Sequence, residues 1–219
     1  MNIFDRILQN RRYWILFFSL LALIVIPAFM GTFAITNFIF RITFSLVFFS
    51  SVSAVMTGRR LILFGIAMAL LVALLQWLSY LFRDESDLVI ATSIFYLAFF
   101  IYIVYRLFLM ILRSGRVTVD VIVVSVCIYL IAGIIFAILC STLDKIYPEA
   151  YSDIVVEGNH IYEFVYYSFI TMATVGYGDI VPKIPQTETV AVLMGITGQL
   201  YMTVVVAILV GKFLQHSGE

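Results

Sequence analysis

Residues 174–179 read Thr-Val-Gly-Tyr-Gly-Asp, and this stretch decides how the whole chain is interpreted. It holds no His, Cys or Lys, and its single carboxylate, Asp179, stands at the end, so it is not typical of an enzyme site. Gly176 and Gly178 tolerate backbone angles that other residues avoid. Successive carbonyl oxygens can therefore turn toward one axis, where rings of oxygens from four copies would replace the water shell of a dehydrated cation.

The same stretch resembles the selectivity filter of the tetrameric potassium channels. The resemblance implies that K+ is the permeant ion and that backbone carbonyls, together with the Thr174 hydroxyl, hold it. The carbonyls belong to the matching positions Thr174, Val175, Gly176 and Tyr177, and Gly178 matches the outer end of the filter. The alternative is a polar turn between two helices, and the completeness of the match argues against it.

The composition indicates a protein that is embedded in a lipid bilayer. Apolar side chains make up 63% of the 219 residues and charged ones only 12%, whereas a soluble domain has about 25% charged residues. The formal net charge of zero gives no reason to expect a nucleic-acid partner. No set of residues suggests catalysis, so we expect no enzyme and no cofactor. Cys127 and Cys140 share one apolar segment and are expected to pack as small apolar side chains.

Six segments are apolar and long enough to cross a bilayer as helices, for which about 20 residues are needed. A shorter apolar stretch at residues 161–173 would span about 20 Å, so it is predicted to enter the membrane and turn back. We therefore predict an all-α integral membrane protein with six transmembrane helices, a re-entrant pore helix, a filter at residues 174–179 and a tetrameric pore. The six segments are residues 13–34, 36–57, 61–82, 88–112, 119–143 and 188–213.

The charges predict the orientation in the membrane. The links that hold residues 83–87 and 144–157 are acidic, whereas arginines and a lysine gather at the opposite ends of the predicted spans. By the positive-inside rule both termini are cytoplasmic and the filter opens to the exterior. The compact form suggests the plasma membrane of a prokaryote. The basic residues are Arg6, Arg11, Arg12, Arg59, Arg60, Arg113, Arg116 and Lys212.

The predicted domains follow from these spans. A cytoplasmic N-terminus at residues 1–12 leads into a four-helix transmembrane domain at residues 13–118. The pore domain covers residues 119–213, with its outer helix first and its inner helix at residues 188–213, and residues 214–219 form a short cytoplasmic tail.

The four-helix domain stands where voltage-gated channels carry their sensor. A sensor needs several arginines at every third position, because each charge that moves gains about 2.3 kcal/mol per 100 mV. The fourth span offers Arg106, which can snorkel to the cytoplasmic end, and Arg113 and Arg116 at or beyond that end. Steep voltage dependence is therefore not expected.

Two tyrosines precede the filter at positions where the potassium channels commonly carry tryptophan. The resemblance implies that Tyr166 reaches Asp179 and that Tyr167 packs on Tyr177, so that all of them support the filter. A generic interfacial aromatic belt is the alternative. Ile170 stands where some relatives have a glutamate paired with the filter aspartate, so their inactivation behaviour does not transfer.

The last span also resembles the inner helix of these channels. Gly198 matches their gating hinge, but a glycine also lets helices approach closely, and both interpretations stay open. Counting at helical spacing from Gly198 gives Met202, Val206 and Val210 on one face. If this face lines the pore, the inner mouth is a hydrophobic constriction that gates by dewetting.

Three further features concern the surroundings of the pore. Arg41 lies inside the second span, where snorkelling toward the exterior is favoured over a pocket for an anionic lipid. The link at residues 113–118 is short, which predicts that the first four helices pack beside the pore helices of their own chain. His160 is a candidate proton sensor, although a lone exposed histidine seldom has that role.

The sequence thus predicts a homotetrameric potassium-selective channel, with K+ and the lipid bilayer as its partners. Two alternatives remain open. One is a weakly selective cation channel on the same pore, which usually changes the tyrosine or the second glycine of the filter. The other is a non-conducting membrane sensor or regulatory subunit, in which the filter would be free to drift. What opens the channel is not predicted.

Overall fold

The computed structural model describes residues 3–29, 33–55, 59–81, 86–115, 117–152 and 161–217. Within these ranges the fold is all-α, and the only bridge between extended segments is an isolated antiparallel pair, Tyr151 with Pro182. The helices are α1 (Ile3–Val25), the 3-10 turn η1 (Ile26–Phe29), α2 (Phe33–Val55), α3 (Arg59–Leu81), α4 (Ser86–Arg113), α5 (Val119–Ile146), α6 (Ile161–Met172) and α7 (Pro185–Ser217).

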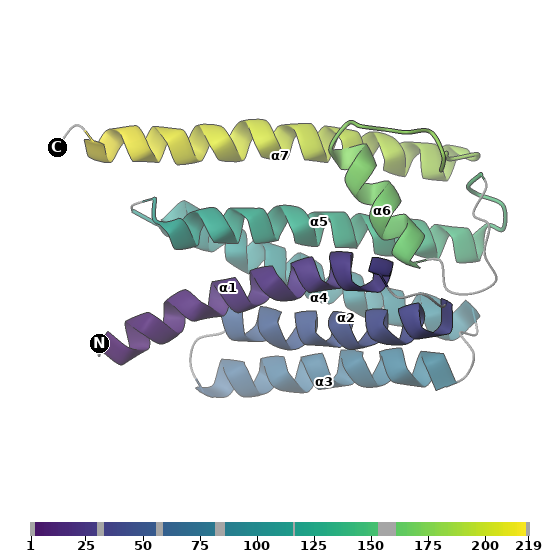
Figure 1. The fold of residues 1–219 in the computed structure, drawn as a ribbon, viewed down its shortest axis with the longest axis horizontal. Helices are drawn as coiled ribbons and strands as arrows, with labels where there is room; N and C mark the ends of the chain where they lie inside the picture. Colours follow the sequence, from purple (N-terminus) through teal and green to yellow (C-terminus); the bar gives the residue numbers. More distant parts are fainter. Residues whose placement is uncertain are drawn as a thin grey trace.

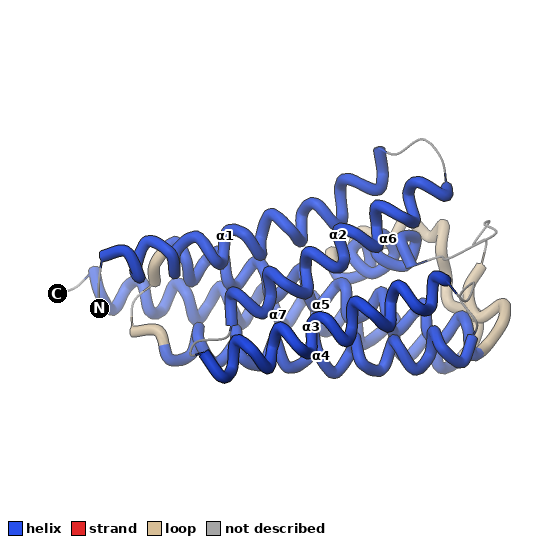
Figure 2. The backbone as a smooth tube through the Cα atoms, turned by 90° about the horizontal axis from the view of Figure 1, so that it is seen from below, coloured by secondary structure: helices blue, strands red, loops and turns tan. Residues whose placement is uncertain are grey.

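The long helices run roughly along one direction, and the short helix α6 crosses them obliquely (Figure 1). Helix α5 lies between α7 on one side and the helices α1–α4 on the other. Helix α1 begins and α7 ends at the same end of the molecule in both views (Figures 1 and 2). Tyr13, which follows Arg12 on α1, and Arg113 of α4 line one pocket, so these basic ends lie close together, while the orientation in the membrane stays a prediction.

The first helix differs from the predicted span at residues 13–34. Helix α1 begins already at Ile3 and ends at Val25, and a 3-10 turn follows it. Pro27 explains the early end, because proline has no N–H to donate and its ring clashes with the preceding turn. The residue before a proline is also pushed out of the helical region.

Four helical stretches of the described chain are long and apolar enough to cross a membrane. They are Ile35–Val55, Asp87–Arg113, Val119–Ile146 and Pro185–Gly211, and a shorter apolar helical stretch covers Gly65–Ser79. Helices α1 and α3 stand where the first and third spans are predicted. The structure therefore supports a multi-pass membrane protein, while the count of six spans stays a prediction.

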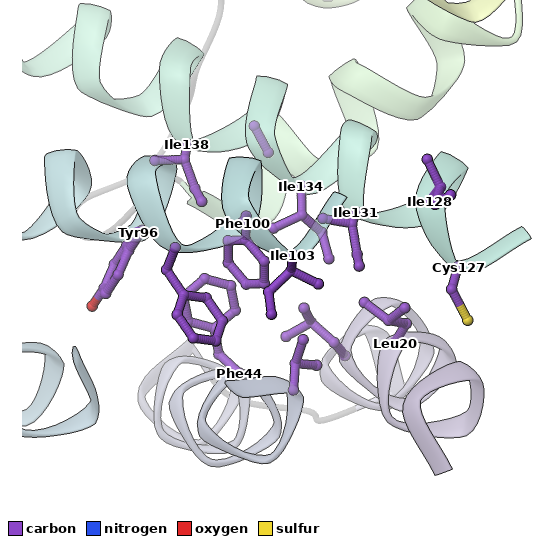
Figure 3. Packing of buried hydrophobic residues seen from close by; sticks show 14 of the residues in the cluster. Leu20, Phe44, Tyr96, Phe100, Ile103, Cys127, Ile128, Ile131, Ile134 and Ile138 are labelled. Atoms are coloured by element: carbon purple, nitrogen blue, oxygen red, sulfur yellow. The ribbon is translucent and has the colours of Figure 1, made fainter. Parts of the chain in front are cut away.

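The core joins the first four helices to α5. Leu20 of α1, Ile103 of α4 and Ile131 of α5 are fully buried and gather in one cluster (Figure 3). Next to them the rings of Phe44 and Phe100 lie 5.7 Å apart, a spacing typical of favourable aromatic pairs. Helices α1 and α4 thus pack on the α5 of their own chain, as the short link predicts.

Arg41 does not snorkel to the exterior, which corrects the expectation from the sequence. Its side chain is 5% exposed, and its Nη1 donates to the carbonyl oxygen of Gln76 at 3.0 Å. The side-chain amide of Gln76 donates in turn to the carbonyl oxygen of Arg41, also at 3.0 Å. This reciprocal pair between α2 and α3 gives each buried side chain one backbone partner, which reduces the cost of keeping these polar groups out of water.

Both cysteines have the predicted role. Cys127 and Cys140 on α5 are buried and free. A thiol in such surroundings behaves as a small apolar side chain.

Candidate filter and inner helix

Helix α6 ends where the glycine-containing stretch begins, within one residue of the predicted boundary. Its last turn is closed by a bond from Ala173 N–H to the Phe169 carbonyl at 2.9 Å. The N–H groups of Val175 and Gly176 then both donate to the carbonyl oxygen of Ile170, at 2.9 and 3.2 Å. The first residues of the candidate filter, at 174–178, therefore satisfy carbonyl groups in the last turn of α6, the candidate pore helix.

These bonds also orient the carbonyl groups of the filter. In a trans peptide the N–H and C=O groups point in opposite directions, and no cis peptide bond occurs in the described chain. The N–H groups of Val175 and Gly176 point at Ile170. The carbonyl oxygens of Thr174 and Val175, which belong to the same peptide groups, therefore point away from the pore helix.

The backbone of the filter alternates in handedness. Thr174, Gly176 and Gly178 have φ of 59°, 52° and 79°, whereas Val175 and Tyr177 between them do not have a positive φ. Such alternation turns successive N–H groups to one side and leaves the carbonyls on the other. Thr174 adopts this conformation although it carries a Cβ, which costs about 1–2 kcal/mol. Strain of this kind is typical of functional sites.

Asp179 is tied to the pore helix by the predicted partner. The Tyr166 hydroxyl donates to Asp179 Oδ2 at 2.7 Å, and the N–H of Ile180 donates to Oδ1 at 3.1 Å. The hydrogen bond from Tyr166 lowers the pKa of Asp179 below its ordinary value. The carboxylate at the end of the filter is therefore ionised near neutral pH and anchored to α6.

Tyr167 is buried, and its ring packs edge-on against Tyr151 with 5.6 Å between the centroids. Tyr177 is 72% exposed in the single chain. The predicted packing of Tyr167 on Tyr177 is therefore not a feature of one chain and stays a prediction.

The segment after the filter is held by residues that the sequence did not single out. Ser152 Oγ accepts from the N–H of Val181 at 3.0 Å, and Thr187 Oγ1 donates to the carbonyl of Ala150 at 3.2 Å. Thr187 also accepts from the N–H of Ile184 at 3.4 Å, as the third residue of a capping box does. Proline at the start of α7, followed by a hydroxyl two residues later, is the sequence signal that could have found Thr187.

Gly198 of α7 touches the end of the pore helix directly. A Cβ placed on it would lie 2.1 Å from the carbonyl oxygen of Met172, whereas one on Gly195 would meet no atom within 4 Å. The structure thus favours close packing for Gly198, one of the two interpretations left open by the sequence. Its role as a gating hinge stays a prediction.

The face of α7 below Gly198 is divided in two. Met202, Val206 and Val210 are exposed at 56%, 50% and 50%, whereas Gly198 and Val205 are buried. A step of four residues advances about 40° around a helix, so three steps move well away from the starting face. Met202, Val206 and Val210 therefore lie on the exposed side of α7, whereas Gly198 is buried, and the lining of the pore by these three residues stays a prediction.

Some predicted residues lie apart from this site or outside the described chain. Arg106 bends back one turn, and its Nη1 donates to the Tyr102 hydroxyl at 2.9 Å instead of reaching toward the end of α4. Outside the described residues lie Arg116, His160, and parts of the acidic segments at residues 83–85 and 153–157.

Comparison with known families agrees with this geometry. Residues 117–215 match the family model described as ion channel, a region that runs from the start of α5 nearly to the end of α7. No curated protein and no solved structure matches the chain. The part that contains the pore helix and the filter is thus similar to the ion channel family, which supports an ion channel function for this multi-pass membrane protein.

Proposed function

We propose that this protein is a potassium-selective channel that conducts K+ passively across the plasma membrane. The observation that carries the proposal is the alternating backbone of residues 174–178, in which the N–H groups of Thr174, Val175 and Gly176 donate to carbonyl oxygens of α6. Its carbonyl oxygens form a column of hard ligands that suits a dehydrated monovalent cation. The match to the ion channel family over residues 117–215 supports the general function.

In this proposal the carbonyls of Thr174, Val175, Gly176 and Tyr177 replace the water around K+. The Thr174 hydroxyl donates its proton to the carbonyl of Ala173 at 2.7 Å. Its oxygen keeps lone pairs for the ion, because a hydroxyl has one proton to give and two lone pairs. Several similar sites in a row allow an ion to enter and still leave.

The filter of one chain is incomplete, which supports a homotetramer. Val175 and Tyr177 are 52% and 72% exposed, whereas Phe164, Tyr167 and Met172 of α6 are buried. Four chains around one axis would close the rings of oxygens and cover these side chains. In that arrangement Tyr167 and Tyr177 of neighbouring copies can meet, and Tyr166 holds the outer end of the filter through Asp179.

The proposed membrane arrangement has six spans, with α6 re-entrant and both termini in the cytoplasm. The irregular filter backbone is tolerable at that depth because it lines a cavity. The pore helix directs the negative end of its dipole, near Met172, toward the centre of the pore, which favours a cation there. The exposed residues Met202, Val206 and Val210 then form a hydrophobic constriction toward the cytoplasm.

Reversal potentials in reconstituted liposomes test the proposal. With opposed gradients of K+ and Na+, a potassium channel reverses close to the K+ equilibrium potential. A reversal near zero would show a weakly selective cation channel instead. The absence of any current, in protein that elutes as an intact oligomer, would favour a regulatory subunit and refute the proposed conduction.

A further inference from the structure

A pocket lies where the C-terminal ends of α2 and α4 meet Tyr13 in the middle of α1. Its volume is about 440 Å³, and the described residues that line it come from these three helices. It lies at the end of the molecule where α4 stops at Arg113, which is the cytoplasmic end in the proposed orientation. The lining residues are Tyr13, Ala54, Val55, Tyr105, Arg106, Leu107, Leu109, Met110 and Arg113.

The charged residues that line this pocket are both basic, although the carboxylate of Asp120 on α5 lies close enough to act on Tyr13. Arg106 and Arg113 line it, and none of the nine lining residues is acidic. The two arginines stand seven residues apart, which is about two helical turns and places them on one face of α4 about 10 Å apart. Arg106 gives one N–H to the Tyr102 hydroxyl, and a guanidinium has five N–H donors, so others can serve a ligand.

The remaining walls are apolar or amphipathic. Ala54 and Val55 close the side formed by α2, and Leu107, Leu109 and Met110 contribute from α4. Tyr13 and Tyr105 offer a ring with a polar tip, the side chain typical of a membrane interface. A ligand that fills this pocket therefore has an anionic part for the arginines and an apolar part for these walls.

We propose that this pocket binds an anionic phospholipid of the cytoplasmic leaflet. Its phosphate contacts Arg113 and Arg106, and the first methylenes of an acyl chain lie on the apolar wall. Free phosphate shares the anionic chemistry but leaves the apolar wall without a partner. The inference goes beyond the proposed conduction of K+. It rests on the proposed function only because that proposal assigns this end of the molecule to the cytoplasmic side of the membrane.

Native mass spectrometry of the detergent-solubilised protein tests the site. Phosphatidylglycerol is titrated against phosphatidylcholine, and the bound lipids are counted on the intact oligomer. We expect phosphatidylglycerol to bind more tightly, and Arg106→Gln with Arg113→Gln to lower its affinity about fivefold per arginine lost. Arg106→Lys keeps the charge and should retain most of the binding. If the double variant fails to assemble, Arg113→Gln alone, at an exposed side chain, gives the answer.

Arg11→Gln is the matched control, because it removes an exposed arginine at the same end of the molecule that does not line the pocket. It should leave the affinity unchanged, and an equal loss there would overturn the proposal. Displacement of the lipid by excess inorganic phosphate would also overturn it, in favour of a free-anion site. Because no ion flux is measured, a protein that binds the lipid but conducts nothing refutes only the proposed function.

Discussion

The aromatic cluster of helices α1–α4 and the proposed pore residues of helices α5–α7 differ in how far a single chain buries them. In the first region the rings of Phe44, Phe48 and Phe100 are buried and pack on one another within a single chain. In the second region Tyr177 and the inner-helix residue Val206 are exposed. The aromatic cluster is covered within one chain, with α5 completing its core, whereas the residues of the proposed pore are covered only in the proposed tetramer.

Helix α5 explains how one chain can hold both kinds of region. Its side chains Ile131 and Ile134 are fully buried at the contact with α1 and α4. Its Tyr129 ring lies 6.5 Å from the Phe169 ring of the pore helix and 5.6 Å from that of Tyr201 on α7. Helix α5 therefore contacts the four-helix region with one set of side chains and α6 and α7 with another, which leaves the four-helix region outside the proposed pore.

Of the substitutions that test this comparison, Gly176→Ala should reduce the K+ flux most. A Cβ at a positive φ costs about 1–2 kcal/mol per chain, and four chains share one filter. We expect K+ flux in liposomes to be lost while the four-helix core still folds, as judged by helical circular dichroism. Gly195→Ala is the control, since a Cβ there meets no atom within 4 Å. Undiminished K+ flux in Gly176→Ala would contradict the role given to this backbone.

Gly198→Ala asks how tightly the pore region is packed. The added methyl group would lie 2.1 Å from the Met172 carbonyl, so the pore helix or α7 must shift. Overpacking of this kind costs about 1–3 kcal/mol. The expected result is a lower melting temperature of the oligomer than for Gly195→Ala. Equal melting temperatures, with altered open probability in Gly198→Ala, would favour the hinge interpretation instead.

Val206→Ser and Val210→Ser test the exposed side of the inner helix. A hydroxyl in a hydrophobic constriction lets water remain there, so the closed pore should leak K+ several times faster. The measurement is the background flux of reconstituted protein, with Val192→Ser as a control near the other end of α7, where the side chain is 60% exposed. An unchanged background flux would place the gate elsewhere.

How far the sequence predicts this molecule depends on the range of the interactions involved. Helix α6 ends within one residue of the predicted end of the pore helix, because its short apolar stretch is followed by a segment that contains two glycines. The bond from Tyr166 to Asp179 is also present as the resemblance implies. Both features depend on residues that lie close together in the chain.

The features that the sequence did not give depend on distant partners. Arg41 donates to Gln76, which is 35 positions away on another helix. Thr187 reaches Ala150 across 37 positions. On α7, Gly198 and Val210 lie on different sides, because each four-residue step turns about 40° around the helix. The contact of Gly198 with the Met172 carbonyl shows which side is buried. Such pairings follow from how the helices are placed, which periodicity alone does not determine.

Of these substitutions, Tyr166→Phe should change the K+ flux least. It tests whether the hydrogen bond to Asp179 holds the outer end of the proposed filter. The pKa of Asp179 is lowered in the folded protein. The charged carboxylate therefore stabilises the folded filter fully at pH values above its ordinary pKa of 3.8. This stabilisation is lost as the pH falls through the lowered pKa. Without the Tyr166 hydroxyl the pKa should return toward 3.8. Flux measured against external pH should then decline at a higher pH in the variant than in the parent, with little difference near neutrality. Identical pH profiles would show that the hydrogen bond does not hold the filter, and that the exposed end of the pore region is fixed by the contacts of Ser152 and Thr187 instead.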